Sequence, residues 1–465
     1  MSQPRTVGEL RSRGDVSKSV KQEMRDNLVA RLRRGESFLP GIVGYDDTVV
    51  PQIENAILSG QDIVLLGERG QAKTRIARLL TGLLDEAVPV LAGCEINDDP
   101  LAPICAACRA RIAERGDDAE IAWLPRDRRY GEKLATPDIT IADLIGEVDP
   151  IKVAEGRYLA DELTIHYGLL PRTHRGIFAL NELPDLAERI QVGLLNIMEE
   201  RDVQIRGYKV RLPIDVYVVA SANPEDYTNR GRIITPLKDR FGSQIRTHYP
   251  RRVADEIAIM EAERTAFAAD GVRTITPEYM KQIVAELTHL ARKATEISQR
   301  SGVSVRVSIC NYENLTSSAL KRAIRLGESE AAPRVSDLGA LVASTAGKIE
   351  LETLGDTSED KVLGKLVQRA VLNVFNRSLT AAELDPVVAA FQGGLTVHVS
   401  EAMPSAEYVR QAEKTPALRA AAHKVSGDGT SPSSLASAVE FVLEGLHLSR
   451  KLNKDSQPGQ SRYRS

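Results

Sequence analysis

The chain has 465 residues, of which 42% are hydrophobic and 27% charged, with a formal net charge of −3. This composition is ordinary for a globular protein, and the length allows two or three domains. The near balance of charge gives no electrostatic reason to expect nucleic-acid binding. The sequence has neither a run of about 18 apolar residues for a membrane span nor the apolar core of an export signal at its start. Four cysteines are too few for a disulfide framework, so we expect a cytoplasmic protein.

The order of patterns along the chain predicts four segments. Residues 1–36 are polar and rich in Arg and Lys, which predicts one or two solvated helices. Within residues 37–250 helical patterns alternate with short apolar runs, and this alternation is typical of a mostly parallel sheet covered by helices. Residues 251–345 are helical in pattern. Residues 346–465 are mostly so, with a short strand expected at 394–400 and a frayed tail from 453. The four expected strands of the sheet are 62–67, 88–93, 176–182 and 216–222.

The first expected strand runs into the sequence GERGQAKTR, which resembles a phosphate-binding loop. Gly67, Lys73 and Thr74 fit the pattern G-x-x-x-x-G-K-[ST], and Ala72 stands where the second glycine belongs. Lys73 would reach the phosphates of ATP, and the Thr74 hydroxyl would hold Mg²⁺. We expect Ala72 to be tolerated, with ordinary helical backbone at the start of a helix. A chance match is the alternative, and the strand and helix on either side argue against it. The expected nucleotide contacts are Gly67, Glu68, Arg69, Gly70, Gln71, Ala72, Lys73, Thr74 and Arg75.

The third expected strand ends in Asn181 and Glu182, where nucleotide hydrolases normally carry Asp-Glu. Glu182 is the candidate base that polarises the attacking water. Asn181 keeps an oxygen that can hold Mg²⁺ through water, but it lacks the charge of aspartate. A change of this kind costs about 10–100-fold in metal affinity or activity, so we predict slow, Mg-dependent ATP hydrolysis. Alternatively, Glu182 is only a carboxylate at a helix start.

Two further residues complete the candidate catalytic set. Asn223 follows the fourth expected strand, where its side chain could position water near the γ-phosphate, although Asn-Pro also begins ordinary turns. Arg240 lies in the sequence PLKDRFG. An arginine there can complete the site of a neighbouring subunit by stabilising charge on the transferred phosphoryl group. A lone arginine is otherwise a solvated surface residue.

Together these motifs resemble the AAA+ ATPases, in the MoxR and magnesium-chelatase I-subunit branch, over about residues 38–345. GERGQAKTR is similar to the MoxR-type loop, in which alanine at this position is common. The resemblance implies a P-loop αβα sandwich with a helical lid, a hairpin within 143–170, an arginine-finger role for Arg240 and a sensor-2 role for Arg306 in GVSVRVSI. It also implies a hexameric ring and a partner with a von Willebrand factor A domain.

Two departures from this family leave several functions open. Asn181 replaces the usual aspartate, and residues 346–465 do not align with the chelatase subunit. The first hypothesis is a ring ATPase, chaperone-like, that remodels or activates a partner protein. The others are the ATPase subunit of a magnesium chelatase and a scaffold that binds ATP with little turnover. Transcription activation with the alternative sigma factor is a weaker relative, because the sequence lacks the GAFTGA loop and a clear helix-turn-helix.

Cys94, Cys105 and Cys108 fall in a predicted insertion near residues 94–130. The Cys-x-x-Cys spacing suits half of a zinc site, and Cys94 offers a third ligand. A fourth ligand is not obvious, since Asp98 or Asp99 would be an unusual choice. We therefore favour free thiols over zinc, because clear zinc motifs use paired ligand sets.

Overall fold

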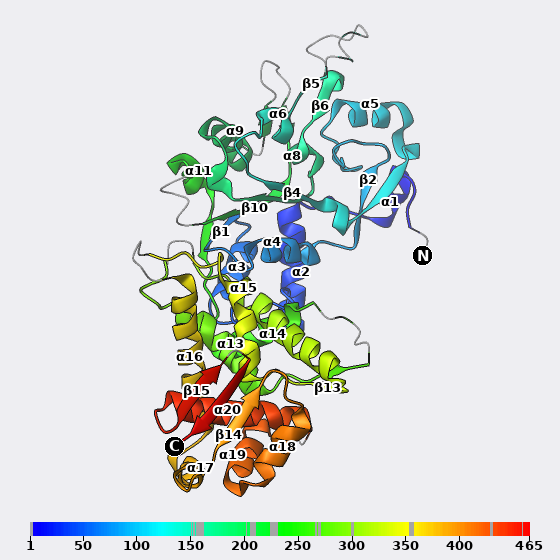
Figure 1. Ribbon diagram of the computed structural model, residues 1–465. Coiled ribbons are helices and arrows are strands. Elements are labelled where there is room, and N and C mark those ends of the chain that lie inside the picture. Colours follow the sequence, from blue (N-terminus) through cyan, green and yellow to red (C-terminus); the bar gives the residue numbers. More distant parts are fainter. Residues whose placement is uncertain are drawn as a thin grey trace. The chain divides into compact units, whose positions relative to one another are not determined.

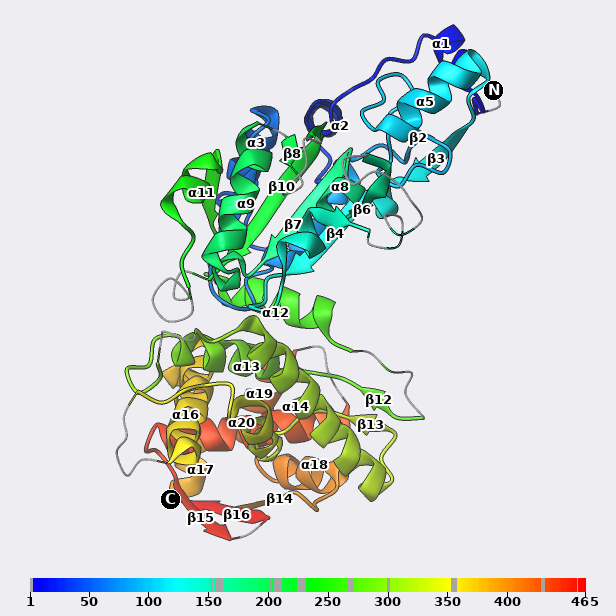
Figure 2. The ribbon, with the colours of Figure 1, turned by 90° about the horizontal axis from the view of Figure 1, so that it is seen from above.

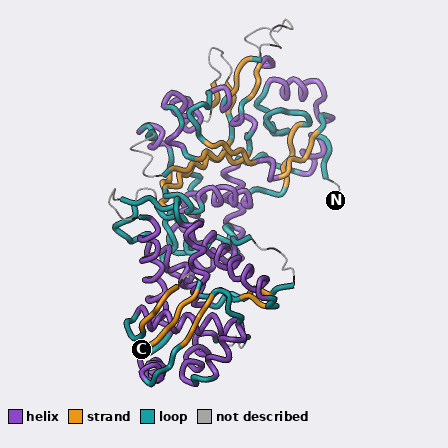
Figure 3. Tube along the Cα trace, in the orientation of Figure 1, coloured by secondary structure: helices purple, strands orange, loops and turns teal. Residues whose placement is uncertain are grey.

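The computed structural model describes residues 3–149, 151, 154, 162–200, 202–204, 211–223, 231–265, 267, 271–298, 302–352, 358–427, 431–457 and 459–465. The chain divides into two compact units, Met1–His248 and Tyr249–Ser465. Strands are concentrated in the first unit, and helices dominate the second (Figure 3). Among the described residues, none of the helices combines the length and the apolar character needed to cross a bilayer.

The N-terminal unit contains short helices, one parallel sheet and several antiparallel strand pairs. Its helices are α1 Val7–Arg13, α2 Val20–Arg34, α3 Val49–Leu58, α4 Lys73–Leu79, α5 Ala106–Arg115, α6 Ile141–Leu144, α8 Leu169–Arg172, α9 Glu188–Glu199 and α11 Thr235–Arg240. Its strands are β1 Ile63–Leu66, β2 Ala87–Leu91, β3 Ile121–Pro125, β4 Tyr130–Leu134, β5 Gly146–Val148, β6 Ile165–Tyr167, β7 Gly176–Asn181, β8 Asp202–Gln204, β9 Arg211–Pro213, β10 Val216–Ala222 and β11 Ser243–Arg246.

The main sheet has five parallel strands in the order β11-β1-β10-β7-β4. Figure 2 shows β10, β7 and β4 side by side. Because the strands are parallel, their carboxyl ends meet at one edge of the sheet. Among the described residues of this unit, three antiparallel strand pairs lie outside the main sheet: β2 with β3, β5 with β6, and β8 with β9.

Alternate residues of the central strands enter two different hydrophobic cores. In β1, Val64 and Leu66 belong to the core that includes α9 and α11, whereas Ile63 and Leu65 belong to the core that includes α2, α3 and α4. Both β7 and β10 are buried along their whole length, as expected for strands covered on two faces. Figure 1 shows these two sets of helices on opposite sides of the sheet. The predicted α/β class, an αβα sandwich, is confirmed.

One of the four expected strands does not belong to the main sheet. The apolar run at 88–93 forms β2, which pairs antiparallel with β3. The parallel neighbour of β7 is instead β4, with the sequence YGEKL. This strand lies at the sheet edge and carries charged residues, so it lacks the apolar run from which the other strands were predicted.

The expectation of solvated N-terminal helices is wrong for α2. This helix buries Val20, Met24 and Leu28 in the core beneath the sheet. It also carries a buried carboxylate, Glu23, which accepts two hydrogen bonds from the Arg129 guanidinium at 2.7 and 2.5 Å. Its many charged residues conceal an apolar stripe of the usual helical spacing.

The C-terminal unit is mostly helical, as predicted, with one large hydrophobic core and a small second cluster around Ala319 and Ala323 of α14. Its central helix α20 is buried over most of its length. Its helices are α12 Val253–Glu263, α13 Glu278–Ala291, α14 Val305–Leu326, α15 Leu341–Thr345, α16 Glu359–Ser378, α17 Ala381–Gln392, α18 Ser405–Glu413, α19 Pro416–Ser426 and α20 Pro432–Leu448. Its strands are β12 Arg273–Thr274, β13 Glu330–Ala331, β14 Val397–Ser400, β15 Asn453–Gln457 and β16 Gln460–Arg464.

The expected short strand near residue 397 is confirmed as β14, but the expectation of a frayed tail is wrong. The last residues form β15 and β16, which make an antiparallel sheet in the order β14-β16-β15. Tyr463 of β16 is buried and donates a 2.5 Å hydrogen bond to Glu444 of α20. Lys454 of β15 donates to the same carboxylate at 2.7 Å. These contacts anchor a polar segment that its composition alone marks as solvated.

Candidate nucleotide-binding site

The candidate phosphate loop follows β1, the strand between β10 and β11 in the main sheet. Gly67 leaves no room for a side chain, because an added Cβ would lie 1.9 Å from Thr247 Oγ1 and 2.2 Å from Gln71 Oε1. Thr247 follows β11, and its N–H donates to the Leu66 carbonyl at 2.8 Å. The close approach of the β1 and β11 ends therefore requires glycine at position 67.

Ala72 adopts the left-handed conformation, with φ 57° and ψ 14°. The expectation of ordinary helical backbone at this position is wrong. Left-handed geometry costs a residue with a Cβ about 1–2 kcal/mol, which explains why the standard loop has glycine there. The loop is held in this shape from outside, since the Gln71 carbonyl accepts a 3.0 Å hydrogen bond from the Tyr45 hydroxyl.

Lys73 is buried at the first position of α4, and its ammonium group lies over the loop. Its Nζ donates to the Gly67 carbonyl and, at 2.8 Å, to the Glu68 carbonyl. The Glu68 N–H in turn donates to Gln71 Oε1 at 3.1 Å. The loop thus closes around one buried positive charge, as a site for phosphate oxygens requires. Arg69 is exposed and Arg75 half-buried.

Thr74 and Asn181 come together although 107 positions separate them in the sequence. The Thr74 hydroxyl lies 3.4 Å from Asn181 Oδ1, at the end of β7. Asn181 Oδ1 also accepts from the Ser221 hydroxyl of β10 at 3.2 Å. The loop after β1 and the ends of β7 and β10 therefore meet in one hydrogen-bonded group. The sequence prediction placed Thr74 and Asn181 in one site but did not find Ser221.

A carboxylate that the sequence analysis missed lies beside Asn181. Asn181 Nδ2 donates a 2.8 Å hydrogen bond to Glu132 Oε1, from the neighbouring strand β4. Arg78 of α4 donates to the same carboxylate at 2.8 and 3.0 Å, and these bonds lower the pKa of Glu132 below its ordinary value. Glu132 is therefore ionised at neutral pH. A negative charge is thus present one side chain away from the position where the usual aspartate is replaced.

Glu182 and Asn223 extend this edge of the sheet. Glu182 follows β7 in the left-handed conformation, with φ 55° and ψ 48°, and its N–H donates to Ser221 Oγ at 3.3 Å. Strained backbone of this kind clusters at functional sites. Asn223 is buried directly after β10. The Gly67 N–H donates to the Ala222 carbonyl at 3.0 Å, so the loop adjoins the residue before Asn223.

The two candidate arginines belong to other elements, α11 and α14. Arg240 ends α11, where its guanidinium donates to the Pro236 carbonyl at 2.8 Å and pairs with Glu199 of α9. Its buried Nε has no hydrogen-bond partner among the described residues. Arg306 lies in the first turn of α14, in the C-terminal unit, and its N–H donates to Ser304 Oγ at 3.2 Å. The roles of both arginines stay predictions.

Two other groups of residues could hold a ligand. The candidate zinc ligands Cys94, Cys105 and Cys108 lie together with Asp98, and one ligand atom from each lies within 4.8 Å of all the others.

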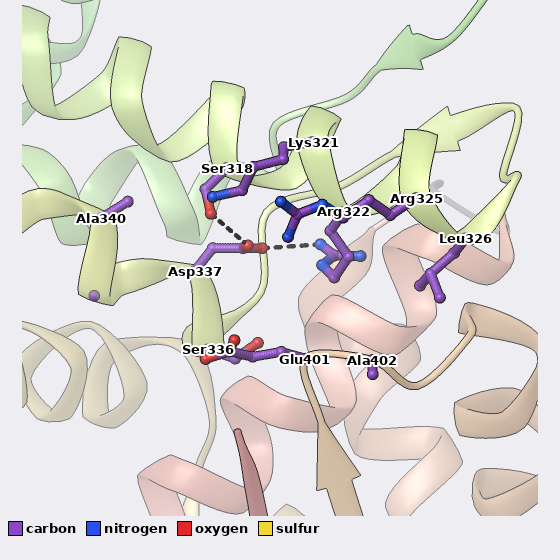
Figure 4. Close-up of a pocket in the computed structure, with 11 residues that line it drawn as sticks. Ser318, Lys321, Arg322, Arg325, Leu326, Ser336, Asp337, Ala340, Glu401 and Ala402 are labelled. Atoms are coloured by element: carbon purple, nitrogen blue, oxygen red, sulfur yellow. Dashed lines mark hydrogen bonds and ion pairs between the residues drawn. The ribbon is translucent and has the colours of Figure 1, made fainter. Parts of the chain in front are cut away.

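In the C-terminal unit, a pocket of about 420 Å³ is lined in part by basic residues of α14 (Figure 4). There Asp337 accepts hydrogen bonds from the Ser318 hydroxyl at 3.0 Å and from Arg322 at 2.8 Å. None of the residues predicted to bind nucleotide lines this pocket.

Comparison with known protein families gives one match within the N-terminal unit. The model of the Sigma-54 interaction domain matches residues 155–240, a stretch that includes β7, β10 and α11. Two transcriptional activators are similar in sequence. The acetoin dehydrogenase operon activator AcoR of Bacillus subtilis is 25% identical over 97 residues, 21% of this chain and 16% of AcoR. The Sigma54-dependent activator SfnR of Pseudomonas putida is 27% identical over 159 residues, 30% of this chain and 43% of SfnR. The chain thus spans less than half the length of either relative.

Solved structures also resemble the chain at low identity. NtrX from Brucella abortus in complex with ATP is 16% identical, with a TM-score of 0.42, over 75% of this chain and 66% of NtrX. The complex between subunits BchI and BchD of magnesium chelatase is 19% identical, with a TM-score of 0.37, over 72% of this chain and 94% of the matched chain. The MoxR branch stays a prediction.

Proposed function

We propose that the chain binds ATP with Mg²⁺ at the carboxyl edge of the main sheet, hydrolyses it, and uses the energy to remodel or activate a partner protein. The contact between Thr74 and Asn181 is the observation that carries this proposal. It joins the lysine-bearing loop to the strand end that holds the candidate base. In open α/β sheets, nucleotides usually bind at the carboxyl ends of neighbouring parallel strands.

The residues at this edge suit a hard divalent cation. Thr74 Oγ1 and Asn181 Oδ1 are two possible oxygen ligands 3.4 Å apart, and the ionised Glu132 carboxylate accepts a hydrogen bond from Asn181 Nδ2. Mg²⁺ prefers such oxygen ligands and keeps several of its waters. Thr74 would hold the ion directly and Asn181 through water, and bound Mg²⁺ neutralises charge on the phosphates. Glu132 would supply the negative charge that Asn181 lacks.

The remaining residues take roles in binding and turnover. Lys73 exchanges its loop carbonyls for phosphate oxygens, and the backbone N–H groups of the loop cradle the phosphates. Glu182 polarises the attacking water, and Asn223 helps to position it. Steps of this kind need positioning and electrostatic stabilisation more than covalent chemistry.

The proposal of ring assembly rests on the family resemblance. In a ring, Arg240 would leave Glu199 and contact the phosphates bound by the adjacent subunit. Exchange of a carboxylate for a phosphate conserves the charge-assisted hydrogen bonds of the guanidinium. A partner with a von Willebrand factor A domain and a hexameric ring belong to this proposal, as does a role in magnesium insertion as the narrower alternative.

A second candidate function is activation of Sigma-54 transcription, which is favoured by the family match over residues 155–240. Against it, the sequence has no GAFTGA loop. Binding of purified Sigma-54 to the chain in the presence of an ATP analogue separates the two, since a partner-remodelling ATPase of another kind would not bind it. An ATP-binding scaffold with little turnover remains the third candidate, and Asn181 is the reason for it.

Titration with ATP and Mg²⁺ tests the binding part of the proposal. Lys73→Ala should weaken ATP binding at least about tenfold, because it removes a buried cation whose ammonium group donates to the loop carbonyls. Lys18→Ala is a matched control, because Lys18 belongs to the same unit and is mostly exposed. Equal ATP affinity of the parental protein and Lys73→Ala would reject the site.

A further inference from the structure

A cluster of cysteines lies between β2 and the first turn of α5, away from the residues assigned to ATP. Cys94 comes from the turn after β2, and Cys105 and Cys108 from the start of α5. Asp98 lies between them in the sequence and is fully buried. One sulfur or carboxylate oxygen from each of these four residues lies within 4.8 Å of the other three. Ligand atoms around a tetrahedral metal ion have separations of this order.

The backbone around the sulfurs favours thiolates. The Asp98 N–H points at Cys94 Sγ at 3.4 Å, and the Cys108 N–H points at Cys105 Sγ at 3.3 Å. Hydrogen bonds from N–H groups stabilise the charged form of an acid. Cys105 is the N-cap of α5, so its sulfur also lies at the positive end of that helix. These contacts favour negative charge on the sulfurs of Cys94 and Cys105.

The turn that carries Cys94 contains left-handed backbone that the sequence pattern does not predict. Gly93 has φ 71°, and Asn97 also has positive φ, at 55°. These two left-handed residues fold the segment back on itself, so that the Leu91 N–H donates to the Asp98 carbonyl at 3.1 Å. The turn thereby brings Cys94 and Asp98 to the same side, facing α5.

Asp98, which the sequence analysis considered only as an unusual choice, lies where a fourth ligand is needed. Its carboxylate accepts hydrogen bonds from three N–H groups: Asp99 at 3.0 Å, Ile104 at 2.9 Å to each oxygen, and Cys105 at 2.9 Å. These three donors fix its orientation, and a carboxylate offers about four acceptor positions, so one position remains for a metal. Asp99 is ruled out as the ligand, because its carboxylate accepts from Ser17 at 2.6 Å and lies 3.7 Å from Arg175.

Three thiolates and a carboxylate around a divalent ion carry a net charge of −2. The N-terminus of α5 contributes a partial positive charge beside such a site. The small cavity of about 110 Å³ beside the cysteines is lined by Arg111 and also by Glu95 and Glu162. Sulfur-rich tetrahedral sites select zinc among the common divalent ions.

We propose that the chain binds one structural Zn²⁺ through four side chains: Cys94, Asp98, Cys105 and Cys108. The ion fastens the segment between β2 and β3, which also holds the N-terminus. The Val7 N–H donates to the Ala119 carbonyl at 3.0 Å, and Thr6 forms a bridge with Glu120. The site has no open position for substrate, since all four ligands come from the protein. This proposal is independent of ATP hydrolysis.

Metal analysis of the full chain, purified without chelator, tests the proposal. We expect about one zinc ion per chain, and less than about a tenth of an ion after the double change Cys105→Ser and Cys108→Ser. Cys310→Ser is the matched control, because Cys310 is the remaining cysteine and lies on α14 of the other unit; it should retain the metal. Parental protein with less than about a tenth of a zinc ion would overturn the proposal.

Cobalt substitution of the parental protein gives a test that does not depend on how the variants fold. Bound Co²⁺ should show sulfur-to-metal charge transfer and the intense visible bands of tetrahedral cobalt. A weak octahedral spectrum, or a disulfide among the cluster cysteines found by mass spectrometry, would contradict the site. Asp98→Asn should lower zinc affinity at least tenfold in competition with a chromogenic chelator. An unchanged affinity and cobalt spectrum would reject Asp98 as the fourth ligand.

Discussion

Replacing Asn181 by aspartate restores the usual motif of nucleotide hydrolases, yet the structure predicts that this change destabilises the N-terminal unit. Asn181 Nδ2 donates to Glu132 Oε1 at 2.8 Å, so Asn181→Asp would place two carboxylates in contact. Two unit charges about 4–5 Å apart repel by about 3–4 kcal/mol at an effective dielectric constant of about 20. Arg78 and the partial exposure of Glu132 reduce this to about 2 kcal/mol. The lost hydrogen bond adds about 1 kcal/mol. We therefore expect a total near 3 kcal/mol.

Urea unfolding at neutral pH measures this loss, followed by the fluorescence of Trp123, the one tryptophan, in β3 of the same unit. The informative comparison is the exchanged pair, Glu132→Gln with Asn181→Asp. It restores one amide and one carboxylate in contact, so it should recover most of the stability lost in Asn181→Asp alone. If Asn181→Asp unfolds within about 0.5 kcal/mol of the parental protein, or if the exchanged pair recovers nothing, the contact between strands β4 and β7 is wrongly described.

Two further predictions concern stability. Ala72→Gly should raise the free energy of unfolding by about 0.5–1 kcal/mol in urea, because glycine adopts the left-handed conformation without strain; a loss of stability would mean that Ala72 has ordinary helical backbone. Burial lowers the pKa of His174 to about 4 from 6.5, and its Nδ1 accepts from the Asp215 N–H at 2.9 Å. The pKa of His174 is lower in the folded state than in the unfolded state, so the neutral imidazole contributes to stability. This contribution is complete above about pH 6.5 and is lost as the pH falls towards 4. The loss of stability should reach about 2 kcal/mol by pH 5. His174→Asn should remove this part of the pH dependence and the exposed His166→Asn should keep it; equal profiles for both variants would refute the assignment.

The sequence was sufficient for three of the five strands of the main sheet, β1, β7 and β10, and for the position of the loop, because these features depend on local patterns. Apolar runs that end in polar residues predicted β1, β7 and β10, and with them the common edge where Lys73, Asn181 and Asn223 lie. The loop motif also predicted a helix directly after it, which α4 confirms, although Ala72 lies outside that helix in left-handed backbone. These patterns reflect burial on both faces of the sheet, a property that the strands carry in their own residues.

Other features depend on contacts between distant residues and therefore could not be read from the sequence. The carboxylate beside Asn181 comes from β4, whose residues are too polar to predict a strand. The same holds for Glu23 and Arg129, a buried ion pair that looks like two solvated charges in the sequence. The left-handed backbone of Ala72 follows from hydrogen bonds made by Tyr45 and the loop, and the alignment of Asp98 with three cysteines needs two turns that only the folded chain displays.

ATP hydrolysis by Glu182→Gln tests the central claim most directly. If Glu182 polarises the attacking water beside the Lys73 loop, this variant should bind ATP as the parental protein does and hydrolyse it at least about 100-fold more slowly. Glu188→Gln is a matched control, because Glu188 is an exposed carboxylate of the same unit at the start of α9, and it should keep the parental rate. Hydrolysis by Glu182→Gln at the parental rate would contradict the proposed site.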